Sequence, residues 1–371
     1  MKIGIDAKWY FTGPVSGVNV VKNLIDNLIK INSNHEFILF ISKEDRFRSN
    51  ELKNKIFNTK FSIVYIPRRI NFITNLFIFP FYFLNKKIDV FLFQNYIPIW
   101  KFKKIIYVNY VHDLVFLDFP NFFLFHEKFI YKFIVSSIKK SSHVITISQS
   151  EIKRILKYTE ISTKNISFVH HGVGDDFFLR STKTIKDVIL KYRLPKKFIL
   201  YVGRINVRKN ILTLLKAVSK LKSNYPLVII GSKAEKKFNL EKELSKLKIK
   251  EKVHVLGFVN NNDLPRLLSA ASLFVFPSFD EGFGLPPLEA IASGTPTIIS
   301  DIPPLVEVCK GAALKFNPQS SNDLVMKIDL LLNNETLYNK HIYLGLERSK
   351  LFSWKKSAIK LLNILENLDK N

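Results

Sequence analysis

The stretch that most constrains the fold of this chain is LFVFPSFDEGFGLPPLEAIASGTPTIISD, which runs from Leu273 to Asp301. It begins with four apolar residues, continues through a glycine-rich loop, and changes to a helical pattern that Pro286 and Pro287 open. Proline is favoured in the first turn of a helix, where its missing N–H leaves no bond unmade. A second apolar run, Thr297–Ser300, closes the stretch. A strand, a loop, a helix and a strand in this order predict a parallel β-α-β unit.

The loop of this unit carries groups that suit a phosphorylated and hydroxylated ligand. Glu281 and Glu289 lie eight positions apart, at either end of the loop and helix start. Gly282 and Gly284 have no Cβ, so the backbone there can approach a ligand closely. The N–H groups that begin the helix after Gly284 lack partners within the helix and favour an anion. Donors for phosphate and acceptors for hydroxyls in one loop fit a nucleotide-activated sugar.

The same alternation of apolar runs and helical stretches continues on both sides of this unit. The chain begins with the apolar run Lys2–Ala7, which a loop containing Gly17 and a helical pattern follow. The alternation restarts near Thr182, and an amphipathic pattern from Trp354 to Leu368 ends it. With 371 residues, the chain is too long for a typical single core. We therefore predict an α/β protein with two domains, each built on a Rossmann-like parallel sheet.

The composition leaves several classes of partner open. The chain has 57 basic and 31 acidic residues, which gives a formal net charge of +26. Such a charge fits nucleic acid, an anionic membrane surface or phosphorylated substrates, or simply a solvated lysine-rich surface. The sequence has no motif typical of nucleic-acid binding, so we expect no nucleic-acid partner. Because Cys309 is the only cysteine and no apolar leader opens the chain, we expect a cytoplasmic protein.

The segment from Phe72 to Leu84, FITNLFIFPFYFL, is the nearest approach to a membrane segment. Its thirteen residues fall short of the roughly 20 that a helix needs to span a bilayer. Two interpretations stay open: a core helix kinked by its proline, or an anchor at the membrane interface. The second draws on the basic residues that flank the segment, which are Arg68, Arg69, Lys86 and Lys87.

A histidine follows one of the predicted strands. His112, in the sequence VHDL, comes at the carboxyl end of an apolar run, where parallel sheets place their chemistry. A lone histidine is more often structural, but the adjoining Asp113 could orient its imidazole or couple to its charge. The pair His170 and His171 follows another apolar run. None of these groups has the spacing of a metal site, so we expect no bound metal.

Three loops of the second half would meet at the carboxyl edge of its parallel sheet. The first carries Gly203, Arg204 and Lys209, the second is the turn Gly257–Val259, and the third contains Glu281. Cations beside a helix N-terminus suit a diphosphate, above all one that leaves with developing negative charge. The alternative, in which Arg204 and Lys209 are ordinary surface residues, stays open on these grounds.

These segments resemble a known family. The chain is similar to retaining glycosyltransferases of family 4, in their mannosyltransferase-like branch, which have the GT-B architecture of two facing Rossmann-like domains. The resemblance rests on FPSFDEGFGLPPLEAIASGTPTIIS, YVGRINVRKN, VHDL, HGVGDDF and SGVNVVKNL. In the first of these, Glu281 and Glu289 match the two glutamates of the family signature. The last two depart from the family pattern, with His171 for asparagine, Gly174 for aspartate and Ser16 for glycine.

The resemblance implies a role for each of these residues. Arg204 and Lys209 would neutralise the donor diphosphate, Glu281 would bind hydroxyls of the transferred sugar, and Glu289 would bind the ribose. Gly17 would close over the phosphates. The implied catalytic residues are His112, Glu281, Arg204 and Lys209. The implied donor-binding residues are Gly17, Gly203, Arg204, Lys209, Gly257, Phe258, Val259, Glu281, Gly282, Phe283, Gly284, Leu285 and Glu289.

The resemblance also implies how the domains divide the work. Residues 1–177 would form the acceptor-side domain, residues 178–352 the donor-binding domain, and residues 353–371 a helix that returns to the first domain. His112 would lie by the transferred sugar, and the Gly257–Val259 turn would border the base. Family members retain the anomeric configuration. Since the chain lacks the Asp-x-Asp sequence of metal-dependent transferases, we expect catalysis without a metal or other cofactor.

The leading hypothesis is a hexosyltransferase that uses a nucleotide sugar and acts on a saccharide or lipid-linked saccharide in surface polysaccharide or lipopolysaccharide synthesis. The HDL segment and the sequence GFGLPPLEA favour GDP-mannose as the donor, with UDP- and dTDP-sugars as alternatives. Peripheral contact with the inner face of the cytoplasmic membrane would suit a lipid-linked acceptor. Two other functions stay open: a nucleotide-sugar epimerase of the same fold, and a non-catalytic protein that binds membranes or polyanions.

Overall fold

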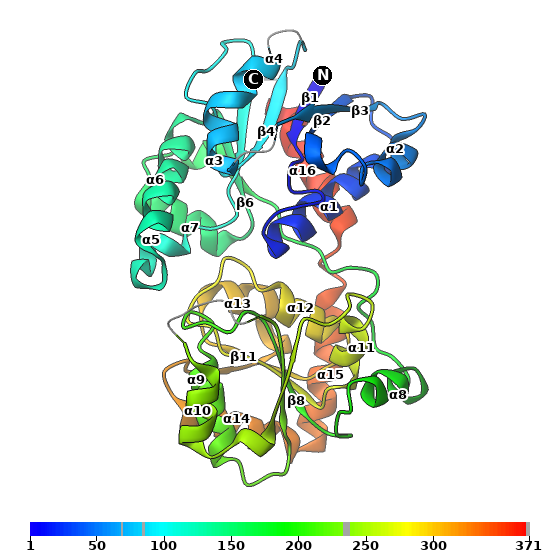
Figure 1. Cartoon of the computed structure of the whole chain (residues 1–371), viewed down its shortest axis with the longest axis vertical. Helices are drawn as coiled ribbons and strands as arrows, with labels where there is room; N and C mark the ends of the chain where they lie inside the picture. The colour runs from blue at the N-terminus through cyan, green and yellow to red at the C-terminus, as the bar shows by residue number, and fades with distance from the viewer. Residues whose placement is uncertain (68–69, 84–85, 233–237, 369–371) are drawn as a thin grey trace. The chain divides into compact units, whose positions relative to one another are not determined.

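The computed structural model describes the whole chain except residues 68–69, 84–85, 233–237 and 369–371 (Figure 1). Arg68, Arg69 and Leu84 therefore lie outside the described residues. The chain divides into two compact units, one of residues 1–172 and 354–371 and one of residues 173–353. This division falls a few residues before the boundary predicted after residue 177. The last helix is part of the first unit.

The first unit is built on a seven-stranded sheet in which all neighbouring strands are parallel. The strand order β3-β2-β1-β4-β5-β6-β7 reverses at β1, where Ile3 lies opposite Phe37 of one neighbour and Val90 of the other. The strands are β1 (Lys2–Asp6), β2 (Glu36–Ser42), β3 (Phe61–Ile66), β4 (Val90–Gln94), β5 (Ile106–Tyr110), β6 (His143–Thr146) and β7 (Ile166–Phe168). The helices are α1 (Val15–Ile29), α2 (Asn50–Ile56), α3 (Asn71–Ile73), the π-helix η2 (Thr74–Ile78), α4 (Phe79–Phe83), α5 (Val115–Asp118), α6 (Phe125–Lys140), α7 (Gln149–Tyr158) and α16 (Trp354–Leu368). Single 3₁₀ turns lie at Lys43–Asp45, Pro120–Phe122 and Thr163–Asn165.

Helices bury both faces of this sheet, so buried residues follow one another along its central strands and do not alternate with exposed ones. All five residues of β4 are buried, for example. α1 buries residues at helical spacing, among them Val20, Leu24 and Leu28, and packs against α16, the red helix of Figure 1. The apolar face of α16, predicted from the amphipathic pattern at the end of the chain, thus packs on α1, the helix that follows the first strand.

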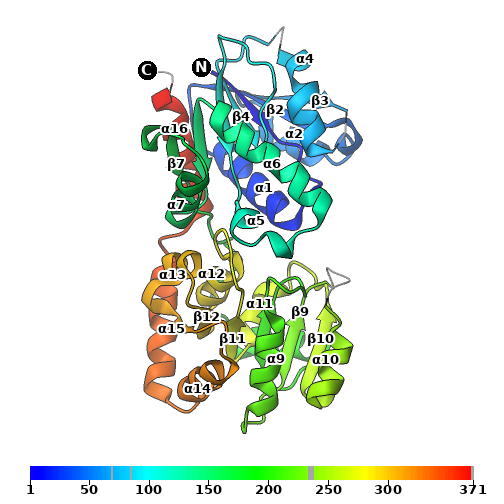
Figure 2. The same ribbon diagram turned by 90° about the vertical axis from the view of Figure 1, so that its left-hand side faces the viewer.

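The second unit repeats the design with a six-stranded parallel sheet of order β10-β9-β8-β11-β12-β13. On one side α9 packs against α10 and α14, while α12 packs against α11, α13 and α15 (Figure 2). The strands are β8 (Ile199–Val202), β9 (Leu227–Ile230), β10 (Val253–Gly257), β11 (Leu273–Phe276), β12 (Thr297–Ser300) and β13 (Leu314–Phe316). The helices are α8 (Thr182–Lys191), α9 (Ile211–Lys220), α10 (Leu240–Leu247), α11 (Leu264–Ala270), α12 (Leu285–Ala292), α13 (Pro303–Cys309), α14 (Ser321–Leu332) and α15 (Glu335–Ser349), with 3₁₀ turns at Lys250–Lys252 and Lys310–Ala312. The predicted α/β class with two parallel Rossmann-like sheets is confirmed.

The apolar segment that begins at Phe72 is a helical run made of α3, η2 and α4. A proline cannot donate to the carbonyl four residues before it, and here the π-turn Thr74–Ile78 precedes Pro80. Leu76, Phe79 and Phe83 are buried, which confirms the interpretation as a core helix for one face. No helix in the described ranges is long and apolar enough to cross a membrane.

Candidate active site

The candidate site lies where the strand order of the second sheet reverses. β8 lies between β9 and β11, so the loops after β8 and β11 leave adjacent strands at one edge, where open parallel sheets bind ligands. The ends of neighbouring strands are closely packed there, since the N–H of Gly203 donates to Ile230 at 2.9 Å and that of Gly231 to Gly257 at 2.8 Å. A Cβ on Gly231 would lie 2.0 Å from the carbonyl oxygen of Gly203. Only glycine therefore permits this approach of the two loops.

Asn210 links the loop after β8 to the loop after β11 by hydrogen bonds. It precedes α9 in the left-handed conformation, with φ of 54°, and it is buried. Its Nδ2 donates to the carbonyl oxygens of Pro277 at 2.9 Å and Pro318 at 2.8 Å. The N–H of Phe279 donates in turn to the carbonyl oxygen of Arg208 at 2.9 Å. These bonds hold the cations of one loop against the carboxylate of the other.

Glu281 lies between two of these cations. Its Oε1 accepts a hydrogen bond from Nζ of Lys209 at 2.5 Å, and its Oε2 accepts one from Arg208 at 3.3 Å. Arg208 also donates to the carbonyl oxygen of Asp280 at 2.9 Å. The side chains of Lys209 and Glu281 are only 12% and 10% exposed. Arg208 is absent from the predicted set of site residues, although two adjacent cations in one loop are a visible signal.

Burial and charge act in opposite directions on this cluster. Burial would raise the pKa of Glu281, but the charges of Lys209 and Arg208 outweigh it and lower the pKa to about 2. Burial lowers the pKa of Lys209 to about 8, although the charge of Glu281 opposes the shift. The charges of Arg208 and Arg204 lower it further. Two cations thus contact one carboxylate, and the third, Arg204, acts on Lys209. The excess positive charge of this cluster suits a polyanionic ligand.

Arg204 follows β8 almost directly and is exposed. Its carbonyl oxygen accepts a hydrogen bond from the hydroxyl of Tyr201 at 2.8 Å, which fixes the backbone below the exposed guanidinium. Gly203 leaves space for that hydroxyl, because a Cβ there would lie 2.8 Å from it. The predicted residues Gly203, Arg204 and Lys209 therefore belong to one fixed loop.

Gly284 determines the path of the glycine loop into α12. Its φ is 113°, and a Cβ there would lie 2.6 Å from Cδ2 of Leu305. Both the dihedral angle and the available space require glycine. α12 begins directly after it at Leu285, with proline in the first turn. Pro286 and Pro287 have no N–H, and the N–H of Leu288 donates to the carbonyl oxygen of Gly284 at 3.3 Å. In this first turn the N–H of Leu285 is therefore the donor that the helix can offer at the edge of the sheet.

The remaining residues of this loop and helix are buried. Gly282 is buried, and the ring of Phe283 packs edge-on against Phe352 with 6.1 Å between centroids. Glu289 lies inside α12, and its side chain is 8% exposed. Burial raises the pKa of Glu289 to about 8, so at neutral pH its carboxyl group is protonated and can both donate and accept a hydrogen bond.

The turn Gly257–Val259 lies at the same edge of the sheet, at the end of the outermost strand β10. Gly257 has φ of 68°, and the phenyl ring of Phe258 is 75% exposed. An exposed aromatic ring beside backbone polar groups suits a planar base. The structure thus brings every predicted site residue of the second half to one edge of one sheet.

His112 belongs to the first unit, two residues after β5. Its Nε2 lies 2.8 Å from Oε1 of Gln94, and its N–H donates to Oδ1 of Asn95 at 3.1 Å. Burial lowers the pKa of His112 to about 4, so the ring is neutral at physiological pH. The expected coupling to Asp113 is wrong, because Gln94 holds the ring and Asp113 accepts a weak bond of 3.4 Å from the N–H of Val115.

Gly17 lies in the first turn of α1, which begins at Val15, and not in the preceding loop as expected. A Cβ on Gly17 would lie 2.7 Å from Cε3 of Trp9. The ring of Trp9 lies in turn 5.2 Å from that of His112. Gly17 and His112 are therefore joined through Trp9.

A buried ion pair next to His112 is absent from the predicted set. Nζ of Lys8 donates to both carboxylate oxygens of Asp6 at 2.7 Å and to Oδ1 of Asn75 at 2.5 Å. Asn75 donates to Asp6 at 2.9 Å and to the carbonyl oxygen of Gln94 at 3.3 Å. Burial lowers the pKa of Lys8 to about 8. Two opposite charges directly after a strand, in GIDAK, are the signal in the sequence.

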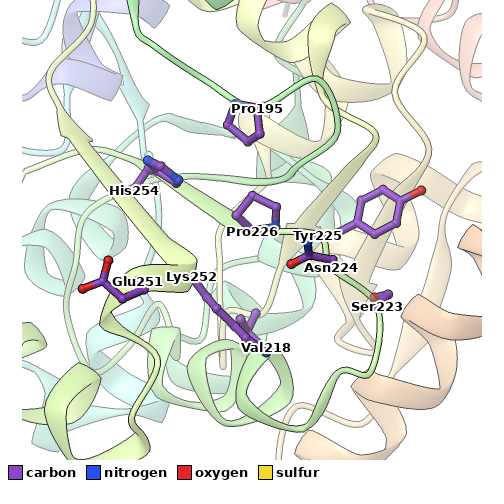
Figure 3. Close-up of a pocket in the computed structure, with 9 residues that line it drawn as sticks. All are labelled: Pro195, Val218, Ser223, Asn224, Tyr225, Pro226, Glu251, Lys252 and His254. Carbon is purple, nitrogen blue, oxygen red and sulfur yellow. The ribbon is translucent and has the colours of Figure 1, made fainter.

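A separate hollow of about 210 Å³ lies at the amino ends of β9 and β10, at the opposite edge of the second sheet from the candidate site. Figure 3 shows its mixed lining of proline rings with Glu251, Lys252 and His254. None of the predicted site residues lines it. Within the ranges that the structure describes, no group of three or more His, Cys, Asp or Glu side chains could hold a metal ion.

Comparison with known proteins agrees with the predicted resemblance. Residues 183–348, somewhat under half of the chain, match the family described as glycosyl transferases group 1. Relatives of the chain include the serotype-specific mannosyltransferase WbdA of Escherichia coli, 31% identical over 262 residues that cover 67% of this chain and 32% of WbdA. Another is the O-antigen chain mannosyltransferase RfbU of Salmonella typhimurium, 30% identical over 62% of this chain and 63% of RfbU.

The chain thus spans about a third of WbdA and somewhat under two thirds of RfbU. Solved structures share its fold at low sequence identity. Sucrose-phosphate synthase of Thermosynechococcus elongatus has a TM-score of 0.77 at 19% identity and covers 99% of each chain. The Anabaena protein HepE, solved in complex with UDP and glucose, has a TM-score of 0.74 at 15% identity, covering 98% of this chain and 99% of HepE.

Proposed function

We propose that this protein is a retaining glycosyltransferase that moves a hexose, with mannose favoured, from a nucleotide sugar to a saccharide or lipid-linked saccharide in surface polysaccharide synthesis. The cluster of Lys209, Arg208 and Glu281 at the strand-order reversal carries this proposal. The family match over residues 183–348 and the names of WbdA and RfbU support it. They favour transfer over an epimerase or a non-catalytic polyanion-binding protein.

The donor diphosphate would bind among Arg204, Arg208 and Lys209. Lys209 is paired with Glu281 in this structure, so an entering diphosphate would share or replace that partner. Its charge would also favour the protonated form of Lys209, which burial otherwise disfavours. The N–H of Leu285 at the start of α12 would add a donor.

Glu281 would then accept hydrogen bonds from hydroxyls of the transferred sugar. Its pKa of about 2 keeps it ionised at every physiological pH, as an acceptor must be. Glu289, protonated and buried, would meet a ribose hydroxyl, and the turn at Gly257 would border the base. His112, whose ring is neutral and held by Gln94, would be a further catalytic residue.

The reaction would proceed by attack on the face from which the diphosphate leaves. The bond between the anomeric carbon and the phosphate oxygen breaks as the acceptor oxygen bonds to the same face, and the acceptor proton passes to the leaving phosphate. The three cations would stabilise the charge that develops on that phosphate. We propose that no metal takes part; turnover that a chelator abolishes and a divalent ion restores would contradict this.

The function is tested by transfer of mannose from GDP-mannose to a mannosylated acceptor, with the product analysed for linkage and for free GDP. Glu281→Ala should lower kcat by about a hundredfold or more, because the sugar loses a charged hydrogen-bond partner. Glu251→Ala, an exposed residue beside the separate hollow, is the control and should retain full activity. Full activity of Glu281→Ala would refute the site, and an epimerised nucleotide sugar would favour the alternative enzyme.

The base of the donor is the least constrained part of the proposal. The HDL segment and the mannosyltransferase relatives favour GDP-mannose, whereas HepE was solved with UDP and glucose. Titration of the protein with GDP, UDP and dTDP in a calorimeter separates these donors. GDP should bind at least about tenfold more tightly than the others, a difference of about 1.4 kcal/mol.

A further inference from the structure

An exposed surface of aromatic and basic side chains lies on the first unit, over the η2–α4 segment, the loop after β4 and α6. Its four aromatic residues, Phe77, Phe81, Trp100 and Phe129, are exposed by 39%, 73%, 58% and 58%. We call it the aromatic–basic surface, and it consists of Phe77, Phe81, Trp100 and Phe129 with the exposed Lys101, Lys103, Lys104 and Lys132 and the half-buried Lys128.

Pro80 explains how the loop after β4 comes to lie against η2. Because proline has no N–H, the carbonyl of Leu76 has no donor four residues along the helix. That carbonyl accepts a hydrogen bond from the N–H of Ile99 at 3.2 Å instead. The bond holds Trp100 beside Phe77, with 6.3 Å between ring centroids. The proline thus couples the two exposed segments.

Core contacts fix the same loop and bring α6 alongside. Phe102 packs edge-on against the buried Phe83 at 6.4 Å, and Lys101 and Lys103 on either side of it are exposed. Nζ of Lys101 lies 5.9 Å from the centre of the Tyr107 ring. Phe72 of α3 lies 5.3 Å from Phe133 of α6, which in turn lies 5.8 Å from Phe129. The exposed rings are therefore held on rigid, packed elements.

The charge of this surface is almost entirely positive. From Phe72 to Lys104 the sequence has one acidic residue, Asp89, and α6 has one, Glu127. Asp89 accepts a hydrogen bond from the N–H of Lys2 at 2.7 Å, and Glu127 one from the N–H of Leu124 at 2.8 Å. Both carboxylates thus cap backbone groups, and the surface lysines outnumber them.

We propose that the aromatic–basic surface docks the protein on an anionic lipid bilayer. Rings of Phe and Trp enter the headgroup region, and lysines around them attract anionic lipids, which is the composition of peripheral membrane sites. A second copy of this chain fits the surface less well, because a symmetric contact would place lysines against lysines. The purpose of docking rests on the proposed lipid-linked acceptor, but vesicle binding itself needs neither donor nor acceptor.

Flotation of the full-length protein with vesicles tests the inference. Wild-type protein should float with vesicles of phosphatidylglycerol and phosphatidylcholine at low salt, and not with phosphatidylcholine alone. Replacing Lys101, Lys103 and Lys104 by Ala should weaken binding about fivefold per lysine, or roughly a hundredfold in total. The double variant Phe81→Ser/Trp100→Ser, which leaves the charge unchanged, should weaken it roughly tenfold or more.

Each variant has a matched control elsewhere on the molecule. Lys242, Lys246 and Lys250 are exposed lysines of the second unit, and their replacement by Ala removes the same charge. Phe47 and Phe57 are 90% and 76% exposed beside α2, which pairs with α1 through Lys55 and Asp26. Both control variants should float like wild type.

Equal losses in the test and control variants would show unspecific attraction by the net charge and overturn the proposal. A dimer in light scattering that Phe81→Ser/Trp100→Ser dissociates, without vesicle binding, would assign the surface to a second copy. Transfer to a water-soluble saccharide acceptor should be unchanged in the surface variants. Failure of docking and failure of the proposed transfer are therefore separate results.

Discussion

Lys209 is a lysine whose charge depends on pH within the working range of an enzyme. Burial lowers its pKa to about 8, so it is mostly protonated at pH 7 and mostly neutral at pH 9. If its charge binds the diphosphate, the affinity for GDP should fall as pH rises above 8, by up to about tenfold per pH unit. Calorimetric titration with GDP between pH 7 and 9 measures this.

The variant Lys209→Arg distinguishes the titration of Lys209 from that of other groups. The guanidinium stays charged throughout this range, so the variant should lose the steep fall above pH 8. The titration of the nucleotide itself is common to both proteins and cancels in the comparison. An identical fall in the variant would show that Lys209 does not titrate against the ligand.

Gln94 should control the protonation state of His112. Its neutral amide faces the ring at 2.8 Å, and burial keeps the pKa of His112 at about 4. Gln94→Glu would place a carboxylate at the same position and raise that pKa by about 1–3 units. If the neutral ring is the active form, activity of the variant should be lost below the raised pKa and return as pH rises.

The check is the pH profile of kcat/KM together with an NMR titration of the His112 ring. Wild-type activity should show no transition from this histidine between pH 5 and 8. An unshifted ring pKa in Gln94→Glu would contradict the positioning by Gln94. An altered pKa with an unchanged profile would instead remove His112 from the reaction.

At the scale of elements, the glycine loop before α12 is the segment least tolerant of change. Gly284→Ala would add a Cβ 2.6 Å from Leu305 at a φ of 113°, so the loop must strain or move. We expect a loss of about 1–3 kcal/mol in the free energy of unfolding and a weaker affinity for the donor. Urea unfolding and GDP titration measure the two effects.

Gly311 provides the matched control for that substitution. It lies in the 3₁₀ turn Lys310–Ala312, and an added Cβ there meets nothing within 4 Å. Gly311→Ala should therefore change the free energy of unfolding by less than about 0.5 kcal/mol. An equal loss of unfolding free energy in both variants would show that neither the dihedral angle of Gly284 nor the space beside Leu305 requires glycine.

The sequence predicts elements well where hydrophobic period and turn chemistry agree, as in the stretch from Leu273 to Asp301. It fails at the first helix, where Gly17 in the first turn hides the helix start at Val15. The sequence also leaves Asn75 and Gln94 undetected as neighbours of Asp6. They meet only because β1 and β4 are adjacent in the sheet, although β2 and β3 separate them along the chain. Pairing between distant strands leaves no local signal.

At the scale of the whole molecule, α16 links the end of the chain to its beginning. Leu361 is fully buried in this helix, which packs on α1 within the first unit. Leu361→Ala should lower the stability of the first unit by about 2–5 kcal/mol, while Ile359→Ala, at a side chain 40% exposed, should cost far less. Because the residues proposed to bind the donor, apart from Gly17, all lie within residues 173–353, GDP affinity should change little in both variants. Scanning calorimetry should then show one transition moved by Leu361→Ala and another moved by GDP. Loss of GDP binding in Leu361→Ala would mean that the two units do not unfold independently or that the first unit shapes the donor site.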